Sequence, residues 1–292
     1  MARTCAGLFR ERPGGDTTMR RPSLMPIVKA LNVDRAIRRN IYAYQLFRTY
    51  VGRFSFMLPL ELEFHAFGVL PSTARLFLDI GANDGISARS FRLFNKTTPI
   101  LSIEPNPCHE KALERTKAAL DLFDYKLIAA GDRRGELVLH TPVVRGIALS
   151  AYAAVDRSEA ERRVREDMPG SAKKLRFIET AVTVVPIDDL TLTPDFVKID
   201  VEGFEFQVLR GMAATIDRCR PVFMIEHHPE NAESIADLLR PFGYRPYVFD
   251  RRASAFRPAG DGAADNLFYL APSQQRSVPI IGGAGVMPVR GI

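Results

Sequence analysis

Short apolar stretches alternate with helix-forming stretches along most of the chain from Arg75 onward. Such alternation is typical of a mostly parallel sheet that carries helices on both faces. The stretches expected to form strands are Leu76–Ile80, Ile100–Glu104, Tyr125–Ala130, Glu136–His140, Val182–Val185, Phe196–Val201, Val222–Glu226, Tyr244–Asp250 and Asn266–Leu270. Those expected to form helices are Ser87–Phe94, His109–Leu120, Phe206–Ile216 and Glu230–Phe242. The pattern predicts a doubly wound α/β fold. Its last two strands, which no clear helix separates, predict a reversed strand at the edge of the sheet.

The sequence around this α/β region divides into further segments. Residues 1–24 are rich in Arg, Gly and Pro and are expected to be disordered. Residues 25–70 are expected to form a helical extension, because apolar side chains recur at helical spacing between Ile37 and Val51. Residues 71–272 then form the main domain. Within it, residues 143–177 interrupt the alternation and suit either a lid or substrate loop or a solvated helix with no role in binding. Residues 273–292 are expected to form a flexible tail.

Charge and composition narrow the class of protein. Residues 1–53 hold eleven Lys and Arg against three Asp and Glu, a local charge of +8 in a chain of net charge +6, so the remainder carries −2. A nucleic-acid enzyme carries its positive charge around its site, so we expect no nucleic-acid substrate. The basic segment is compatible with contact with acidic lipid or an anionic partner, and a solvated charged surface is the simpler reading. Lacking a signal peptide or membrane-spanning run, and with three widely spaced cysteines, the chain is expected to be soluble and cytoplasmic.

A glycine-containing loop, Leu78 to Gly85, follows the first expected strand and reads LDIGANDG. Gly81 allows a tight turn and a close approach of a ligand to the backbone. A dinucleotide-binding loop needs a third glycine where this chain has Asn83, and Asp79 would repel a pyrophosphate. A carboxylate at Asp79 instead suits the cationic amino-acid end of S-adenosylmethionine. The loop therefore predicts a site for this sulfonium cofactor.

A second acidic element lies at the end of the next expected strand. Glu104 follows Gly85 by 19 residues, and its carboxylate has the two oxygens needed to accept hydrogen bonds from both ribose hydroxyls. Asp132 ends the following strand segment, where contacts to adenine are expected. The residues predicted to bind the cofactor are Asp79, Gly81, Ala82, Asn83, Gly85, Glu104, Pro105, Asn106 and Asp132.

A third motif, Phe196 to Glu205, reads FVKIDVEGFE. Lys198, Asp200 and Glu202 have the same parity along the strand and are expected to share a face at its carboxyl end, where doubly wound sheets bind their ligands. A purely structural reading is also open, in which Lys198 pairs with Asp200 and Glu205 begins a helix.

These motifs together resemble the FkbM family of methyltransferases. The resemblance rests on Asp79–Gly85, Ser102–Pro107 and Val197–Met212, and spans roughly Leu76 to Leu270. It implies a class I, Rossmann-like S-adenosylmethionine fold, with a seven-stranded sheet whose last strand is antiparallel. It also implies an O-methyltransferase that acts on a hydroxyl group of a sugar, in a polysaccharide or glycolipid, or of a secondary metabolite.

The expected chemistry requires positioning of the acceptor hydroxyl and a base. The candidate catalytic residues are Asp200, His227, Glu202 and Lys198, with Asp200 or His227 as the base. His228 is expected to point elsewhere if the strand continues. No metal is assigned, although an alternative has Asp200, Glu202 and His227 holding a divalent ion.

Two other enzyme classes remain open at this point. A methyltransferase acting on RNA or protein predicts basic and aromatic residues around the site. A nicotinamide-dependent dehydrogenase predicts a complete three-glycine loop. The chain has neither feature.

Overall fold

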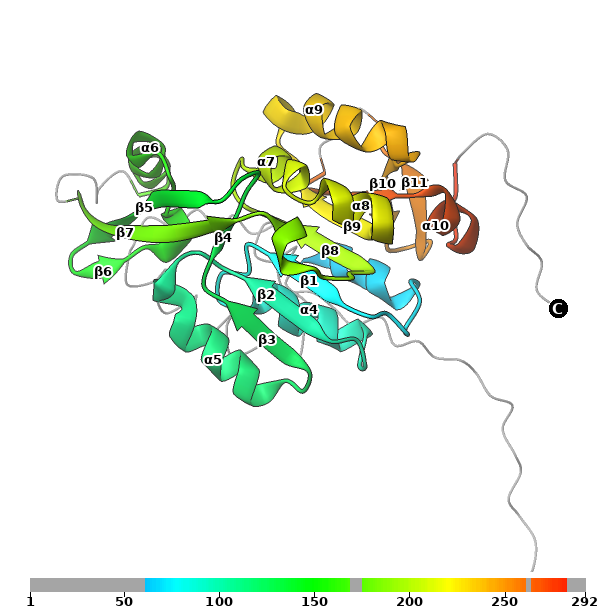
Figure 1. Ribbon diagram of the computed structural model, residues 1–292, viewed down its shortest axis with the longest axis horizontal. Coiled ribbons are helices and arrows are strands. Elements are labelled where there is room, and N and C mark those ends of the chain that lie inside the picture. Colours follow the sequence, from blue (N-terminus) through cyan, green and yellow to red (C-terminus); the bar gives the residue numbers. More distant parts are fainter. Residues whose placement is uncertain (1–60, 169–174, 261–263, 283–292) are drawn as a thin grey trace, which may run out of the picture.

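The computed structural model describes residues 61–168, 175–260 and 264–282 (Figure 1). The expected disordered segment 1–24 and all of the expected helical extension before residue 61 lie outside these ranges. The end of that extension forms a 3-10 helix, η1 (Leu62–Gly68). In the described ranges no helix has both the length and the apolar character needed to cross a membrane.

One large sheet forms the centre of the molecule, with strand order β11-β10-β12-β9-β8-β1-β2-β3. Its strands are β1 (Phe77–Ile80), β2 (Ile100–Ile103), β3 (Phe123–Lys126), β8 (Phe196–Ile199), β9 (Val222–Glu226), β10 (Arg245–Asp250), β11 (Ala255–Pro258) and β12 (Asn266–Leu270). Strands β3, β2, β1, β8 and β9 are parallel, and β1 lies between β2 and β8. The carboxyl ends of β1, β2, β8 and β9 therefore meet along one edge of the sheet.

The sheet has eight strands rather than the expected seven, because β10 continues through a turn into β11, which the alternation pattern did not reveal. The last strand, β12, is antiparallel to both its neighbours, as expected for a reversed strand. It does not lie at the edge, however, but between β9 and β10. The side chains of β12 are buried along its whole length, which accounts for its interior position.

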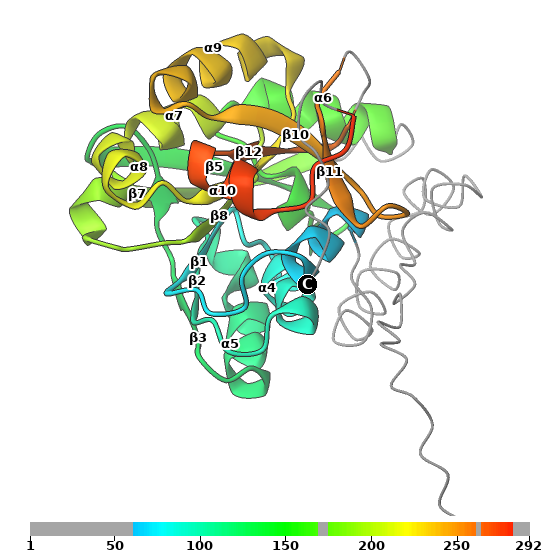
Figure 2. The same cartoon turned by 90° about the vertical axis from the view of Figure 1, so that its right-hand side faces the viewer.

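Helices cover both faces of this sheet and enclose two apolar cores (Figures 1 and 2). On one face, η1, α4 (Ile86–Phe94) and α5 (Glu110–Ala119) pack on a core rich in phenylalanine. On the other face, α7 (Glu205–Arg210), α8 (Ala213–Cys219) and α9 (Pro229–Leu239) pack on a core rich in aliphatic side chains. The remaining helical turns are η2 (Pro107–His109), η3 (Ser150–Tyr152), η5 (Ile187–Leu190), η6 (Arg240–Phe242) and α10 (Pro272–Ser277). Helix α10 thus begins the segment that was expected to be a loose tail.

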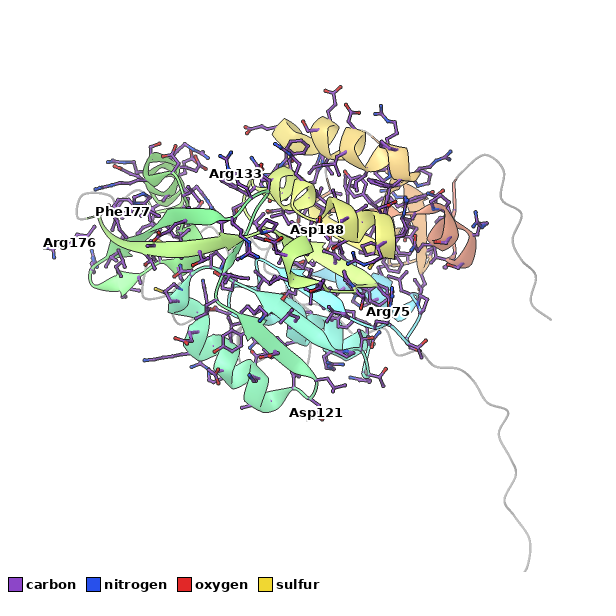
Figure 3. All side chains as sticks on the ribbon, in the orientation of Figure 1. Arg75, Asp121, Arg133, Arg176, Phe177 and Asp188 are labelled. Carbon is purple, nitrogen blue, oxygen red and sulfur yellow. The ribbon has the colours of Figure 1, made fainter. Side chains whose placement is uncertain are left out.

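A second, four-stranded sheet projects beside the first, with order β4-β7-β5-β6 (Figure 1). Its strands are β4 (Ala129–Ala130), β5 (Gly135–Val144), β6 (Ile147–Ala148) and β7 (Leu175–Val185). The long antiparallel pairing of β5 with β7 includes both ends of the expected lid insertion, so the strands predicted at 136–140 and 182–185 are much longer than expected. Helix α6 (Arg157–Asp167) packs on this sheet through its own small core, and the labelled Arg176 and Phe177 mark the outer end of β7 (Figure 3).

Candidate functional site

The loop after β1 adopts a conformation that its glycines make possible. Gly81 and Gly85 have φ of 83° and 73°, values that favour glycine. A Cβ on Gly81 would lie 1.7 Å from the carbonyl oxygen of Asp200. The backbone after β8 therefore requires glycine at this position, and the approach of a ligand to Gly81 stays a prediction. Gly85 begins α4, and a Cβ there would lie 2.9 Å from Thr116 Oγ1.

Asp79 lies at the carboxyl end of β1 and is fully buried. Its Oδ2 accepts hydrogen bonds from Ser87 Oγ at 2.6 Å and Ser102 Oγ at 2.8 Å. Its Oδ1 is buried and has no hydrogen-bond partner among the described residues. Burial raises the pKa of Asp79, although Lys198 and the two serine hydroxyls act in the opposite direction. One oxygen of this carboxylate is therefore held firmly, and the other has an unmet capacity to accept.

Glu104 lies beside the same loop. Its Oε2 accepts from the backbone N–H of Asn83 and its Oε1 from that of Asn106, each at 2.8 Å. Burial raises the pKa of Glu104, against the effect of His109 and of both backbone donors. Ser102, which binds Asp79, precedes Glu104 by two residues on the same strand end, so both acids lie on the same side of the sheet. We call Asp79, residues 81–85 and Glu104 the loop half of the site.

Of the other residues predicted to bind the cofactor, Ala82 lies within the loop half, Asn106 lies next to it, and Asp132 lies in another segment. Ala82 is buried in the loop, and its N–H donates to the carbonyl oxygen of Ile103. Asn106 is buried next to Pro105 and donates to Thr141 Oγ1 at 3.2 Å. Asp132 follows β4 instead, where its Oδ2 lies 3.5 Å from Arg210 Nη1 at the end of α7. A contact of Asp132 with adenine stays a prediction.

Lys198 and Asp200 begin the second half of the site, at the carboxyl end of β8. The Nζ of Lys198 lies 2.8 Å from Asp200 Oδ2, and the lysine side chain is 2% exposed. Burial disfavours the ammonium, but Asp200, Glu61 and Asp79 outweigh this effect and raise the pKa of Lys198. The pKa of Asp200 is lowered, because Lys198 outweighs the effect of burial. The ion pair of the structural reading is therefore present.

Glu61, just before η1, lies near Lys198 and Asp200, and its place there was not predicted from the sequence. Burial, with Asp200, Glu63 and Asp79 nearby, raises its pKa to about 7 in spite of Lys198. Its Oε2 is buried without a hydrogen-bond partner among the described residues. No local pattern around Glu61 indicates this position, because η1 brings it there by packing under the sheet.

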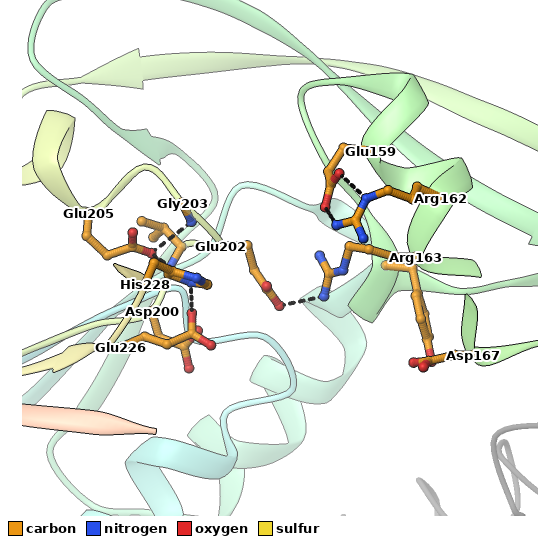
Figure 4. Close-up of polar contacts among 12 residues, drawn as sticks. Glu159, Arg162, Arg163, Asp167, Asp200, Glu202, Gly203, Glu205, Glu226 and His228 are labelled. Carbon is orange, nitrogen blue, oxygen red and sulfur yellow. Dashed lines mark hydrogen bonds and ion pairs between the residues drawn. The ribbon is translucent and has the colours of Figure 1, made fainter. Parts of the chain in front are cut away.

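His228 lies just after the end of β9, beside two acidic side chains. Its Nε2 lies 2.9 Å from Glu226 Oε2 and 3.9 Å from Glu205 Oε1 (Figure 4). The expectation that His228 points elsewhere held only if the strand continued, and β9 ends at Glu226, so the alternation of the strand does not apply to His228. His227 donates its backbone N–H to the carbonyl oxygen of Asp265, and its role as a base stays a prediction.

Glu226 completes this acidic group. Burial, together with the neighbouring Asp200 and Glu202, raises its pKa to about 9. Glu226 lay next to predicted residues in the sequence but was not itself assigned a role. A pair of neighbouring carboxyl groups shares a proton in such an arrangement, since two adjacent negative charges are unfavourable. We call Asp200, Glu202, Glu226 and His228 the acidic edge.

The turn after Asp200 sets the position of Glu202. Glu202 and Gly203 have φ of 56° and 102°, and Glu205 Oε1 accepts hydrogen bonds from the backbone N–H groups of Val201 and Gly203. Glu202 then projects toward α6, where its Oε1 lies 2.9 Å from Arg163 Nη2 (Figure 4). The insertion predicted as a lid thus contacts the acidic edge directly.

The segment before β8 has a structural role. Asp188 Oδ1 and Oδ2 accept hydrogen bonds from the backbone N–H groups of Thr215 and Ala214, at the start of α8. Arg75, which precedes β1, pairs with Asp195, which precedes β8. Figure 3 labels both Asp188 and Arg75. Asp188 therefore stabilises the fold beneath the site.

Comparison with protein families gives one match, described as the methyltransferase FkbM domain, over residues 79–246. The matched range starts at Asp79 and includes both halves of the site. No curated protein sequence matches the chain significantly.

Comparison with solved structures finds methyltransferases at low identity. A methyltransferase FkbM from Methylobacillus flagellatus is 16% identical, with a TM-score of 0.45, over 84% of this chain and 59% of that protein. An O-methyltransferase family protein from Burkholderia thailandensis is 9% identical, with a TM-score of 0.39, over 71% and 54% of the two chains. A precorrin-6y C5,15-methyltransferase from Geobacter metallireducens is 10% identical, with a TM-score of 0.38, over 70% and 82%. The chain spans less than two thirds of the first two of these proteins.

Proposed function

Because this chain belongs to the FkbM methyltransferase family, we propose that it transfers a methyl group from S-adenosylmethionine to a hydroxyl group of a sugar or a secondary metabolite. The methyl transfer, the cofactor and the class of acceptor together make up the proposal. The family match favours methyl transfer over the nicotinamide-dependent reaction. The main support is that the loop half and the acidic edge lie side by side, joined where Gly81 meets the carbonyl oxygen of Asp200.

The chemistry of the loop half fits this cofactor. Asp79 has one buried oxygen that no described residue contacts by a hydrogen bond, which suits a cationic ligand or a water molecule bound to it. Each oxygen of Glu104 accepts one backbone N–H and can accept another hydrogen bond, as two ribose hydroxyls require. When bound, S-adenosylmethionine supplies a methyl group already activated by its sulfonium.

The acidic edge would then orient the acceptor and remove its proton. Asp200 is ionised and fixed by Lys198, so it can accept the hydrogen bond of an acceptor hydroxyl and take up its proton. Lys198 acts as a positioning residue in this scheme, because its ammonium is buried against Asp200. Helix α6 lies over the edge through Arg163 and would help to exclude water.

Calorimetry tests the cofactor assignment with the full chain. S-adenosylhomocysteine is expected to bind with one site per chain, and NAD is expected not to bind. Equal binding of the two ligands, or binding of NAD alone, would remove the assignment. The acceptor class is tested by transfer of a labelled methyl group to panels of glycans, small hydroxylated metabolites, RNA and protein. Labelling confined to RNA or protein would contradict the hydroxyl-acceptor proposal.

A further inference from the structure

We propose that the acidic edge binds a divalent metal ion through Glu202, Glu226 and His228. Each of these side chains offers one ligand atom, and the three atoms lie within 4.8 Å of one another. Two carboxylate oxygens and an imidazole nitrogen at such mutual distances can all reach one ion. The residues come from the turn after β8 and from the end of β9, so the fold rather than one local motif brings them together (Figure 4).

The acidic side chains around the three residues outnumber the basic side chains that pair with them, so the group carries an excess of negative charge. Lys198 is held by Asp200, and Nη2 of Arg163 donates to Oε1 of Glu202. The carboxylate of Glu202 has a second oxygen, so an ion need not displace Arg163. The remaining acids, Glu226 and Glu205, face His228 and backbone N–H groups.

A second observation points to a ligand at this place. Asn266 on β12 pairs directly with Glu226 across the antiparallel β9–β12 ladder, so both side chains leave the same face of the sheet as close neighbours. Asn266 is 7% exposed, and its Oδ1 is buried without a hydrogen-bond partner among the described residues. A buried amide oxygen without a donor is unfavourable. A cation, or a water molecule bound to one, would satisfy this oxygen beside Glu226.

The donor set indicates which ions fit. Carboxylate and amide oxygens favour hard cations such as Mg²⁺ and Mn²⁺, and a single imidazole is compatible with Mn²⁺. The described cysteines, Cys108 and Cys219, are not in this group. We therefore assign the site to a cation of the Mn²⁺ and Mg²⁺ class. Its use in binding acceptor hydroxyls rests on the proposed function, whereas its affinity for the ion does not.

Titration of Mn²⁺ into the full chain tests the site, with prior removal of metal by a chelator and without cofactor. Electron paramagnetic resonance of free Mn²⁺ is expected to show one saturable ion per chain. The variants Glu226→Gln and His228→Ala are each expected to weaken binding at least about tenfold, since each removes one ligand. The matched control Glu230→Gln, an exposed acid at the start of α9, is expected to retain the original affinity.

Substitutions at Asn266 and His227 test the assignment of the ligands more directly in the same Mn²⁺ titration. Asn266→Asp is expected to tighten Mn²⁺ binding by adding a carboxylate, and Asn266→Leu to weaken it. His227→Ala is expected to leave the affinity unchanged. The proposal is overturned if the original chain binds no Mn²⁺ saturably, or if His227→Ala rather than His228→Ala abolishes binding.

Two controls keep the result interpretable. Circular dichroism in the presence of chelator shows whether each variant is folded, and a variant that is folded but binds Mn²⁺ normally contradicts the assignment of its residue. Calorimetry with S-adenosylhomocysteine in chelator separates the two proposals. If this ligand binds and Mn²⁺ does not, only the metal site fails; if Mn²⁺ binds and this ligand does not, only the cofactor assignment fails.

Discussion

The buried carboxylates of the loop half and those of the acidic edge have different polar neighbours. In the loop half, Asp79 and Glu104 are surrounded by donors: two serine hydroxyls for the first and two backbone N–H groups for the second. In the acidic edge, Asp200 and Glu226 face each other; Asp200 pairs with the buried Lys198, and Glu226 lies 2.9 Å from His228. In the loop half three of the four carboxylate oxygens accept hydrogen bonds from described residues, and Asp79 Oδ1 does not, whereas the acidic edge has an excess of acceptors.

The two halves therefore differ in how far they are preorganised to bind a ligand and in how they affect the stability of the folded chain. Donors that are already oriented cost nothing to arrange when a ligand binds. Acids that lack donors instead destabilise the folded chain until a proton, a cation or a substrate neutralises them. The following changes should therefore act in opposite directions on the two halves.

The largest expected loss of stability comes from a substitution at Gly81, where the loop half contacts the acidic edge. Gly81→Ala places a Cβ 1.7 Å from the Asp200 carbonyl oxygen, so we expect a loss of about 4 kcal/mol or more in the free energy of unfolding. Denaturant unfolding measures it. Gly203→Ala is the matched control, because Gly203 also has positive φ but a Cβ there would meet nothing within 4 Å; its cost should be about 1 kcal/mol. Similar losses for both variants would contradict the clash.

The next effect concerns the loop half alone. Glu104→Gln replaces one acceptor oxygen by a donor opposite a backbone N–H, so affinity for S-adenosylhomocysteine should fall about 100-fold, with loss of stability as well. Calorimetry and thermal unfolding measure the two effects. The exposed Glu110, at the start of α5, provides the control variant Glu110→Gln. Unchanged affinity in Glu104→Gln would show that the ribose lies elsewhere.

In the acidic edge, the corresponding change should stabilise the chain. Because the pKa of Glu226 is raised to about 9, the folded chain keeps a proton that the unfolded chain releases above its ordinary pKa. The free energy of unfolding should therefore fall between about pH 5 and pH 9 in the original chain. Glu226→Gln lacks this loss and should gain roughly 2 kcal/mol at pH 8 in the presence of chelator. Denaturant unfolding at pH 6 and pH 8 checks this, and equal pH slopes for the two proteins would refute it.

The smallest effect concerns the contact between the insertion and the acidic edge. Arg163→Ala removes a partly exposed ion pair with Glu202, so stability should change by less than about 1 kcal/mol. Hydrogen exchange in α6 should nevertheless become faster, because this contact joins the helix to the edge. Arg165→Ala removes an ion pair within α6 itself and is the control. Equal exchange in the two variants would indicate that Arg163 does not hold the insertion in place.

The loop half was largely predictable from the sequence, and the acidic edge only in part. The residues of the loop half are contiguous or follow one strand end, so spacing alone indicates that Asp79 and Glu104 lie together. The parity of Lys198 and Asp200 likewise identified their ion pair. His228 depends on where β9 ends, which alternation does not reveal.

More distant contributions could not be read from a local pattern. Glu61 and Asn266 reach the site through the packing of η1 and through the insertion of β12 between β9 and β10. The insertion 143–177 was visible in the sequence as an interruption of the alternating strands and helices. The long antiparallel pairing of β5 with β7 was not visible. Residues on the two ladder strands alternate between buried and exposed only weakly, so periodicity gave a short strand at each end.

The close approach of Gly81 to the carbonyl of Asp200 has a consequence for how this enzyme can diversify. The spacing between the place where a methyl donor would rest and the place where an acceptor would rest is set by main-chain atoms of two adjoining strands. Side chains of the neighbouring sheet and of α6 can change without altering that spacing. Under the proposed function, new acceptors would be accommodated by changes in these peripheral side chains, while the distance from methyl donor to acceptor would stay the same.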